Sequence, residues 1–324
     1  MRMRGLSLMC LVCAGPALAD FPETVRDHIL PGYQTFADAT EALSVSAAQS
    51  CQTEDLRPAF NLAYDAWLGV QHLRFGPVEQ DGVGLAIAFW PDPKGAGVKA
   101  QKALLLGDSA VLEPESFAQQ SVAARGLTGL ERLLFPKDAL PADPCALIRA
   151  TALDLARTAA QINSGWRLAF ADTMLTAGEA GNSTYLSHGE VRQTLFTQVV
   201  TGLEFIEDQR LGRPLGTFDA PHPERAEAVA SGRSQRNVIL SLQALRALVV
   251  TLTPDVPKSM AALDHAIALA QAMNDPVLAG VAELQTRLKV EILQQAVLAA
   301  RDTVLAELGP KLQTDVGFNA ADGD

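Results

Sequence analysis

Apolar residues recur at helical spacing along most of this chain, and that periodicity limits its fold more than any other feature. Val238, Leu242, Leu245, Val249 and Leu252 follow one another at intervals of four, three, four and three residues, which places all five on one face of a helix. Signals for strands are weak. The sequence therefore predicts an all-α protein.

Two helix-start signals share one pattern. Asp143-Pro144 and Asp275-Pro276 each place an acidic N-cap residue before a proline at the first helical position. We expect the first pair to open a helix at 145–162. The second pair should open a long helix at 278–308, which Gly309-Pro310 ends.

Two up-and-down helical bundles are the simplest way to pack these amphipathic helices. We expect a first bundle domain over residues 20–142 and a second over 143–317, divided at a proline-rich stretch. An irregular loop at 75–97 interrupts the first bundle, and ordered loops of that length are often functional. The small, acidic residues 318–324 predict a disordered tail.

One four-residue segment occurs twice. Thr128-Gly129-Leu130-Glu131 recurs 73 residues later as Thr201-Gly202-Leu203-Glu204, each time within a helix-periodic stretch. We interpret the match as an internal duplication of helical units. Glu204 would then be the equivalent, in the second unit, of Glu131.

Residues 1–19 have the pattern of a secretory signal peptide. Arg2 and Arg4 precede an uncharged apolar run, and Ala17-Leu18-Ala19 fits the small-x-small cleavage rule. We expect cleavage after Ala19 and export to a bacterial periplasm. No later stretch is long and apolar enough for a membrane-spanning helix, so we expect no transmembrane segment in the mature chain.

Export determines how the cysteines and the charge are interpreted. Cleavage leaves Cys51 and Cys145, which in an oxidising compartment predict one disulfide bond. The formal net charge of −11 argues against nucleic acids and anionic membranes as partners.

Glu131 is the most informative polar residue, because leucines flank it on an otherwise apolar helix face. The sequence has no H-E-x-x-H, no G-x-S-x-G and no glycine-rich phosphate loop. A buried carboxylate needs a partner, and two interpretations remain open. Glu131 pairs internally with Arg125, Arg132 or Arg74, or it lines a cation or ligand site between helices.

A second group of candidates borders the irregular loop. Trp67, His72 and Arg74 lead into this loop, and Trp90 lies within it. The aromatic residues serve either the core or a binding surface. A guanidinium at a helix end can hold a carboxylate, either from a ligand or from Glu131.

Several segments, in their order along the chain, resemble the imelysin-like family of exported bacterial proteins. They are Arg74-Phe75-Gly76-Pro77, Phe89-Trp90-Pro91-Asp92, the stretch from Ala124 to Phe135, and Arg210-Leu211-Gly212-Arg213-Pro214-Leu215-Gly216. The resemblance implies an all-helical fold with two bundle domains. It also implies the signature G-x-H-x-x-E. Gly126 and Glu131 match this signature, whereas Thr128 stands at the histidine position.

The missing histidine bears on function. Some members of the family are described as metallopeptidases, and a threonine hydroxyl is a poor metal ligand compared with imidazole. Other members are linked to iron acquisition. By this resemblance we expect a non-catalytic binding component of metal uptake, with iron or another divalent cation as ligand and periplasmic or outer-membrane iron-uptake proteins as partners. Its hypothetical binding residues are Glu131, Arg74, Thr128, Trp67, Trp90 and His72.

Two other functions stay open at this point. The chain could be a docking module that holds a protein or peptide with its 75–97 loop. It could also be a divergent metallopeptidase with an unusual site that depends on Glu131.

Overall fold

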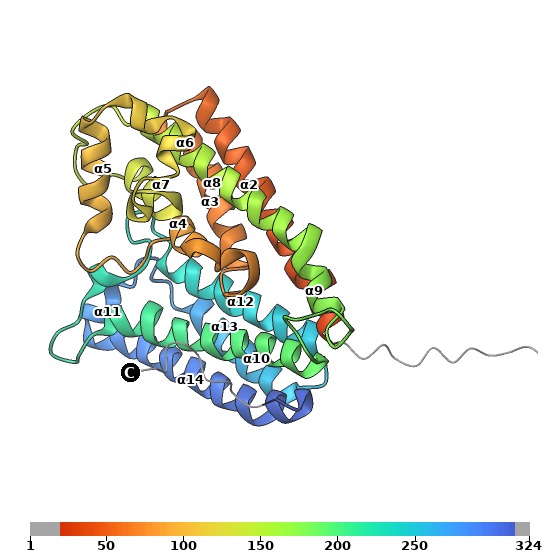
Figure 1. Ribbon diagram of the computed structural model, residues 1–324. Helices are drawn as coiled ribbons and strands as arrows, with labels where there is room; N and C mark the ends of the chain where they lie inside the picture. The colour runs from red at the N-terminus through yellow and green to blue at the C-terminus, as the bar shows by residue number, and fades with distance from the viewer. Residues whose placement is uncertain (1–19, 315–324) are drawn as a thin grey trace, which may run out of the picture.

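A computed structural model describes residues 20–314, and within this range it contains helices and no strands. Figure 1 shows the longer helices in two groups, one above the other. The expected all-α class is confirmed. The expected signal peptide at 1–19 and the tail at 318–324 lie outside the described residues.

The first group is a ring of four helices. α2 (Leu30–Gln49) packs against both α3 (Thr53–Leu68) and α8 (Cys145–Gly165), and the short α7 (Gly126–Leu134) closes the ring between α3 and α8. The expected disulfide bond between Cys51 and Cys145, with Cα atoms 5.3 Å apart, joins the starts of α3 and α8.

The second group is also a ring of four helices. α10 (His188–Glu204), α12 (Ser234–Leu252), α13 (Pro257–Ala272) and α14 (Leu284–Leu312) pack each against the next, and α14 returns to α10. These four run side by side in Figure 1. The five apolar residues expected to share one face of α12 are all buried.

The remaining helical segments are short. They are α1 (Phe21–Thr24), η1 (Val25–Ile29), η2 (Gly76–Val78), η3 (Gln80–Gly82), α4 (Val83–Ile87), α5 (Ala96–Leu106), η4 (Ser109–Leu112), α6 (Pro114–Phe117), η5 (Val122–Ala124), η6 (Trp166–Phe170), α9 (Ala171–Leu175), η7 (Phe205–Gly212), α11 (Arg213–Leu215), η8 (Pro223–Arg225) and η9 (Ala279–Ala282). Here η1, η6 and η7 are π-helical turns and the other η segments are 3₁₀ turns.

Helix packing does not follow the division expected after residue 142. α8 begins beyond that point, yet it packs in the first ring. The disulfide bond ties its start to α3, and a buried ion pair of 2.9 Å between Asp154 of α8 and Arg125 ties it to the start of α7. The chain passes into the second ring only after α9.

The two T-G-L-E segments do not hold equivalent places in the rings. The first lies on α7, the third helix of its ring along the chain, whereas the second lies on α10, the first helix of the other ring. A duplicated bundle would carry the segment at the same position in both copies. Glu204 is therefore not the counterpart of Glu131.

The two aspartate-proline pairs behave differently. α8 begins at Cys145 as expected, and Asp143 accepts a 3.0 Å hydrogen bond from the Cys145 N–H, but the N-cap residue is Pro144 and not Asp143. Asp275 instead accepts bonds from the N–H groups of Ala279 and Gly280, which close the turn η9. Because those bonds stabilise a separate turn, α14 starts later than expected, at Leu284, and it runs on to Leu312.

An irregular excursion replaces regular helix between α3 and α5, as expected for 75–97. It contains η2, η3 and the five-residue α4, and a cis peptide bond joins Trp90 to Pro91. Among residues 20–314, no helix combines the length and the apolar character needed to cross a bilayer.

Candidate functional site

A buried ion-pair network joins the two rings. Arg210, on the π-helical turn η7 that extends α10, pairs with Glu227 at 2.7 Å, and each side chain is only 3% exposed. Arg210 also donates to Ser241 at 2.8 Å and to Gln71, which follows the end of α3. Asn237 donates to Glu227 at 2.8 Å. These bonds compensate for burying the two charges and hold α3 against η7 and α12.

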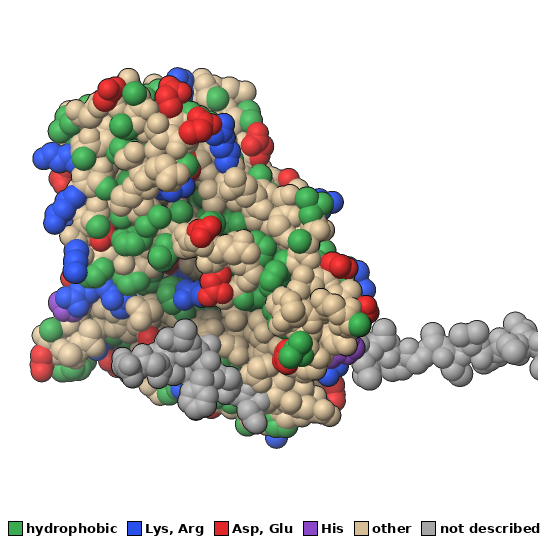
Figure 2. Space-filling view, viewed as in Figure 1, with side chains coloured by type: hydrophobic (Ala, Val, Ile, Leu, Met, Phe, Trp, Pro, Cys, Tyr) green, Lys and Arg blue, Asp and Glu red, His purple; other side chains and the backbone are tan. Residues whose placement is uncertain are grey.

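A cleft of about 440 Å³ lies beside this network, between the end of α3, the excursion and η7; we refer to it as the interbundle cleft. Most of its lining is aromatic or apolar, namely Trp67, Leu73, Val78, Leu85, Ala88, Trp90, Pro91 and Phe205. Arg74 and Glu79 are its charged residues. In Figure 2 the hollow lies near the middle of the face, where basic and acidic side chains meet within an apolar surround. This size and lining are typical of small-molecule sites.

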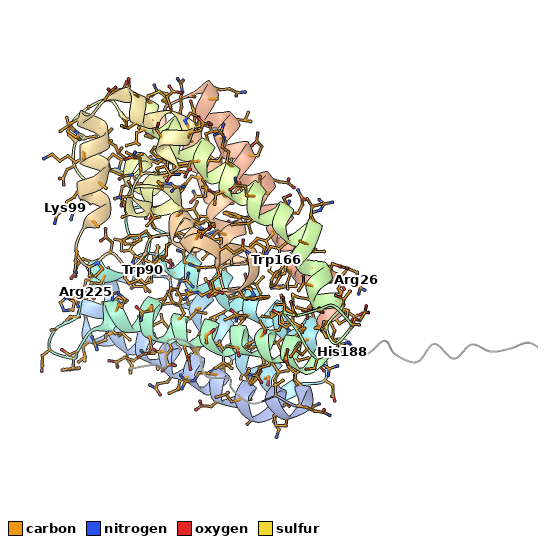
Figure 3. All side chains as sticks on the ribbon, viewed as in Figure 1. Arg26, Trp90, Lys99, Trp166, His188 and Arg225 are labelled. Carbon is orange, nitrogen blue, oxygen red and sulfur yellow. A yellow bond between two sulfur atoms is a disulfide. The ribbon has the colours of Figure 1, made fainter. Side chains whose placement is uncertain are left out.

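Three of the predicted residues line the interbundle cleft together. Trp67 comes from α3, Arg74 from the turn after α3, and Trp90 from the excursion. Figure 3 shows Trp90 between the two groups of helices. Its ring meets that of Phe205 edge-on, with centroids 6.0 Å apart. Sequence reasoning missed Phe205, although it directly follows the second T-G-L-E segment.

Two guanidinium groups flank the ring of Phe205. The Arg74 group lies 4.4 Å from the ring centroid and the Arg210 group 5.0 Å from it. Residues five apart diverge on an α-helix, but the wider i→i+5 turn of η7 brings Arg210 back over Phe205. The π-helical turn thus builds a paired cation–π contact at the edge of the cleft.

Arg74 is placed by its backbone and not by an acidic partner. Its N–H donates to the side chain of Gln198 at 2.8 Å. Across residues 20–314, its guanidinium forms neither an ion pair nor a hydrogen bond. Desolvation by the cleft walls, and then the charge of Arg210, lower the pKa of Arg74, but a guanidinium remains cationic at neutral pH.

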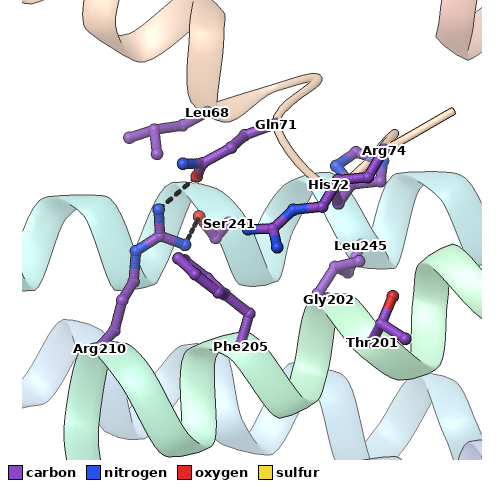
Figure 4. A pocket seen from close by; sticks show the side chains of 10 residues that line it. All are labelled: Leu68, Gln71, His72, Arg74, Thr201, Gly202, Phe205, Arg210, Ser241 and Leu245. Atoms are coloured by element: carbon purple, nitrogen blue, oxygen red, sulfur yellow. Dashed lines mark hydrogen bonds between the residues drawn. The ribbon is translucent and has the colours of Figure 1, made fainter. Parts of the chain in front are cut away.

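His72 faces a small polar pocket that adjoins the cleft. Figure 4 shows this pocket of about 20 Å³, where the guanidinium groups of Arg74 and Arg210 point toward its middle from opposite sides. The Nε2 atom of His72 lies 3.0 Å from that of His28. Burial lowers the pKa of His28 to about 4 and that of His72 well below its usual value. Both imidazoles are therefore neutral at pH 7, and one donates to the other.

Glu131 is buried away from the interbundle cleft, at 8% exposure. Its Oε1 accepts bonds from the N–H and the O–H of Ser231, at 2.9 and 2.7 Å. Burial raises the pKa of Glu131, and the two serine bonds partly oppose this shift. The predicted ion pair with an arginine is wrong for the described residues: Arg125 binds Asp154, and Arg132 donates to a glutamine.

Ser231 is the hydrogen-bond partner of Glu131, and the sequence did not indicate this contact. In the structure α12 begins at Ser234, whose hydroxyl donates to the Glu227 carbonyl at 2.6 Å. Ser231 is thus free to bind Glu131 from 100 positions away, a distance that no local pattern encodes.

Gly126 and Thr128 seat the excursion on α7. The Thr128 hydroxyl accepts a 3.2 Å bond from the Phe89 N–H, next to Trp90. Gly126 has φ +64°, and a Cβ there would lie 2.2 Å from the carbonyl oxygens of Ala86 and Ile87. Only glycine fits both constraints. These signature positions therefore shape one wall of the cleft without lining it.

Glu204 lies on the surface of the second ring. Its carboxylate is 3.6 Å from the Arg301 guanidinium, and its side chain is 43% exposed. Among residues 20–314, no group of three or more His, Cys, Asp and Glu side chains is placed to hold a metal ion.

The fold and the cleft define an all-helical protein in which two four-helix rings enclose a cationic, aromatic cleft. A family model described as Imelysin matches residues 29–304, and the chain belongs to this family. It is 23% identical to "Iron-regulated protein A" from Synechococcus elongatus over 307 residues, covering 86% of this chain and 78% of that protein.

Two solved structures share the fold. An imelysin-like protein from Psychrobacter arcticum superposes with a TM-score of 0.74 at 20% identity, over 91% of this chain and 95% of that one. A putative iron-regulated protein A precursor from Parabacteroides distasonis has a TM-score of 0.70 at 13% identity, over 90% and 96%.

Proposed function

We propose that this protein is a non-catalytic, periplasmic binding component of iron acquisition, and that its ligand occupies the interbundle cleft. The observation that carries the proposal is the convergence of Trp67, Arg74 and Trp90 on one cleft of ligand size. The names of two relatives support the link with iron: one is "Iron-regulated protein A", and the other, from a different organism, is a putative iron-regulated protein A precursor.

The bonds of the signature residues support a role without catalysis. Thr128 uses its hydroxyl to hold the backbone of Phe89, and Glu131 uses Oε1 to hold Ser231. A general base or a metal ligand must offer its lone pair to the reacting group. Here the Thr128 hydroxyl and the Oε1 atom of Glu131 act within the protein, as supports for the excursion and for the loop before α12.

Binding and growth together test this function. The mature protein is titrated with Fe(II), Fe(III) and haem by calorimetry, and a deletion strain is grown under iron limitation. We expect saturable binding of at least one iron form and slower growth that the wild-type gene restores. A gene carrying Arg74→Gln should restore growth less well than one carrying Arg57→Gln, a matched change of a ring-stacked arginine outside the cleft. Absence of binding together with unaltered growth would refute the proposal.

A protease assay tests the non-catalytic part separately. The protein is incubated with an unfolded protein substrate, with and without a chelator, and Glu131→Gln serves as the variant. We expect no cleavage in any arm. Chelator-sensitive cleavage that Glu131→Gln abolishes would establish a metallopeptidase instead.

A further inference from the structure

Hydrogen-bond donors without partners gather around the interbundle cleft. Trp67 lines the cleft and is 3% exposed, yet its Nε1–H has no partner among residues 20–314. The Arg74 guanidinium, as described above, also forms no bond with the described residues. Arg213, which lies 6.0 Å over the ring of Trp90, has a buried Nε–H without a partner in the same range.

These groups have one chemical property in common, because indole and guanidinium nitrogens donate and do not accept. The Arg74 side chain is exposed and lines the cleft, so a ligand that supplies acceptors can reach its guanidinium and pair with it. Arg210 does not compete for the anionic group of a ligand, since Glu227 already neutralises its charge. Glu79 is the one carboxylate among the cleft-lining residues of the described chain, and it is exposed.

We propose that the interbundle cleft binds a small organic carboxylate with a flat apolar body, whose carboxylate contacts Arg74 and whose body lies against Trp90 and Phe205. Arginine binds carboxylates with two parallel N–H···O bonds. The aromatic walls provide the surface that a planar apolar group covers. The inference rests on the proposed function for the location of the ligand, but it needs no iron.

Calorimetry with salicylate tests this ligand class, with neutral salicylamide as the matched probe. We expect saturable binding of salicylate and affinity for salicylamide at least about tenfold lower, because a charged pair contributes more than a neutral one. Arg74→Gln should weaken salicylate binding about tenfold, because it removes the charged partner of the carboxylate. Arg57→Gln should bind as the wild type does.

Three results would overturn the proposal: equal affinity for salicylate and salicylamide, unaltered affinity in Arg74→Gln, or no saturable binding of salicylate, benzoate or phthalate. The iron-free titration separates this inference from the proposed function. If none of the three carboxylates binds and the deletion strain still grows slowly under iron limitation, only the proposed ligand class is refuted. If a carboxylate binds and the deletion strain grows normally under iron limitation, only the proposed role in iron acquisition is refuted.

Discussion

The two T-G-L-E segments are identical in sequence and differ in what their polar atoms do. Both lie on helices, and Leu130 and Leu203 are both fully buried. Glu131 is nonetheless buried and bound to Ser231, whereas the Glu204 side chain is 43% exposed beside Arg301. Local sequence therefore determined the helix and the apolar contact, and the neighbouring ring determined the role of the carboxylate.

Replacing the glycine of each segment by alanine should give the largest difference in stability between the two segments. A Cβ on Gly129 would lie 2.4 Å from the backbone oxygen of Ala124, but on Gly202 the nearest atom, at 2.6 Å, belongs to the flexible side chain of Leu245. We expect Gly129→Ala to lower the free energy of unfolding by about 3 kcal/mol. Gly202→Ala should cost about 1 kcal/mol or less, since alanine favours the helix. Urea denaturation measures both, and equal losses would contradict this account.

Truncation of the two glutamates should give the next largest difference. Glu131→Ala leaves the Ser231 N–H without its acceptor and leaves the Ser231 O–H only the Ala228 carbonyl, at 3.2 Å. We therefore expect a loss of about 2 kcal/mol in the free energy of unfolding. For Glu204→Ala we expect a loss of about 0.5 kcal/mol or less, because exposed ion pairs contribute little. Thermal and chemical denaturation measure both losses. Similar losses for the two variants would show that burial does not make Glu131 contribute more to stability than Glu204.

The sequence predicted those features of the fold that depend on nearby residues in the chain or on a single pair of residues. The spacing on α12, the start of α8 and the paired cysteines are short-range or pairwise signals, and the structure has all three. The Glu131–Ser231 contact and the place of Phe205 beside Arg74 arise where the two rings meet. Arg74 and Trp90 were identifiable because irregular chain surrounds them, and Trp67 because it lies in the last turn of α3 before that chain. Phe205, by contrast, lay in an uninterrupted helical pattern.

The two threonines should differ by a smaller amount. Thr128 accepts the Phe89 N–H across to the excursion, while Thr201 donates to the carbonyl of Thr197 within its own helix, at 2.8 Å. Thr128→Val should cost about 1 kcal/mol because it leaves a backbone donor unpaired. Thr201→Val should be nearly neutral. Hydrogen exchange offers a second measurement: faster exchange at Phe89 is expected in Thr128→Val and not in Thr201→Val.

The smallest expected effect is the part of the pH dependence of protein stability that comes from Glu131. Its pKa is raised in the folded protein, chiefly by burial. The folded state therefore holds the proton more tightly, and this contribution to stability is present below about pH 4.5 and lost as the pH rises through the folded pKa. The amide that Glu131→Gln introduces does not titrate and can keep the bonds from Ser231. Relative to the wild type, this variant should gain stability, by about 1 kcal/mol or less, between about pH 4 and pH 8.

A series of denaturation curves across that pH range measures the gain, with Glu204→Gln as the control. A gain for Glu131→Gln that is constant with pH, or that shrinks as the pH rises, would show that the buried carboxylate is not the source of the difference.

The cross-link between Cys51 and Cys145 has a consequence for how this protein is made. It closes a loop of 94 residues, which on the chain-entropy model stabilises the fold by about 4–5 kcal/mol. A host cytoplasm keeps thiols reduced, so material produced there would lack this contribution and would melt earlier than the oxidised form. Samples for quantitative work should be prepared by secretion or oxidative refolding, with free-thiol titration as the check on each batch.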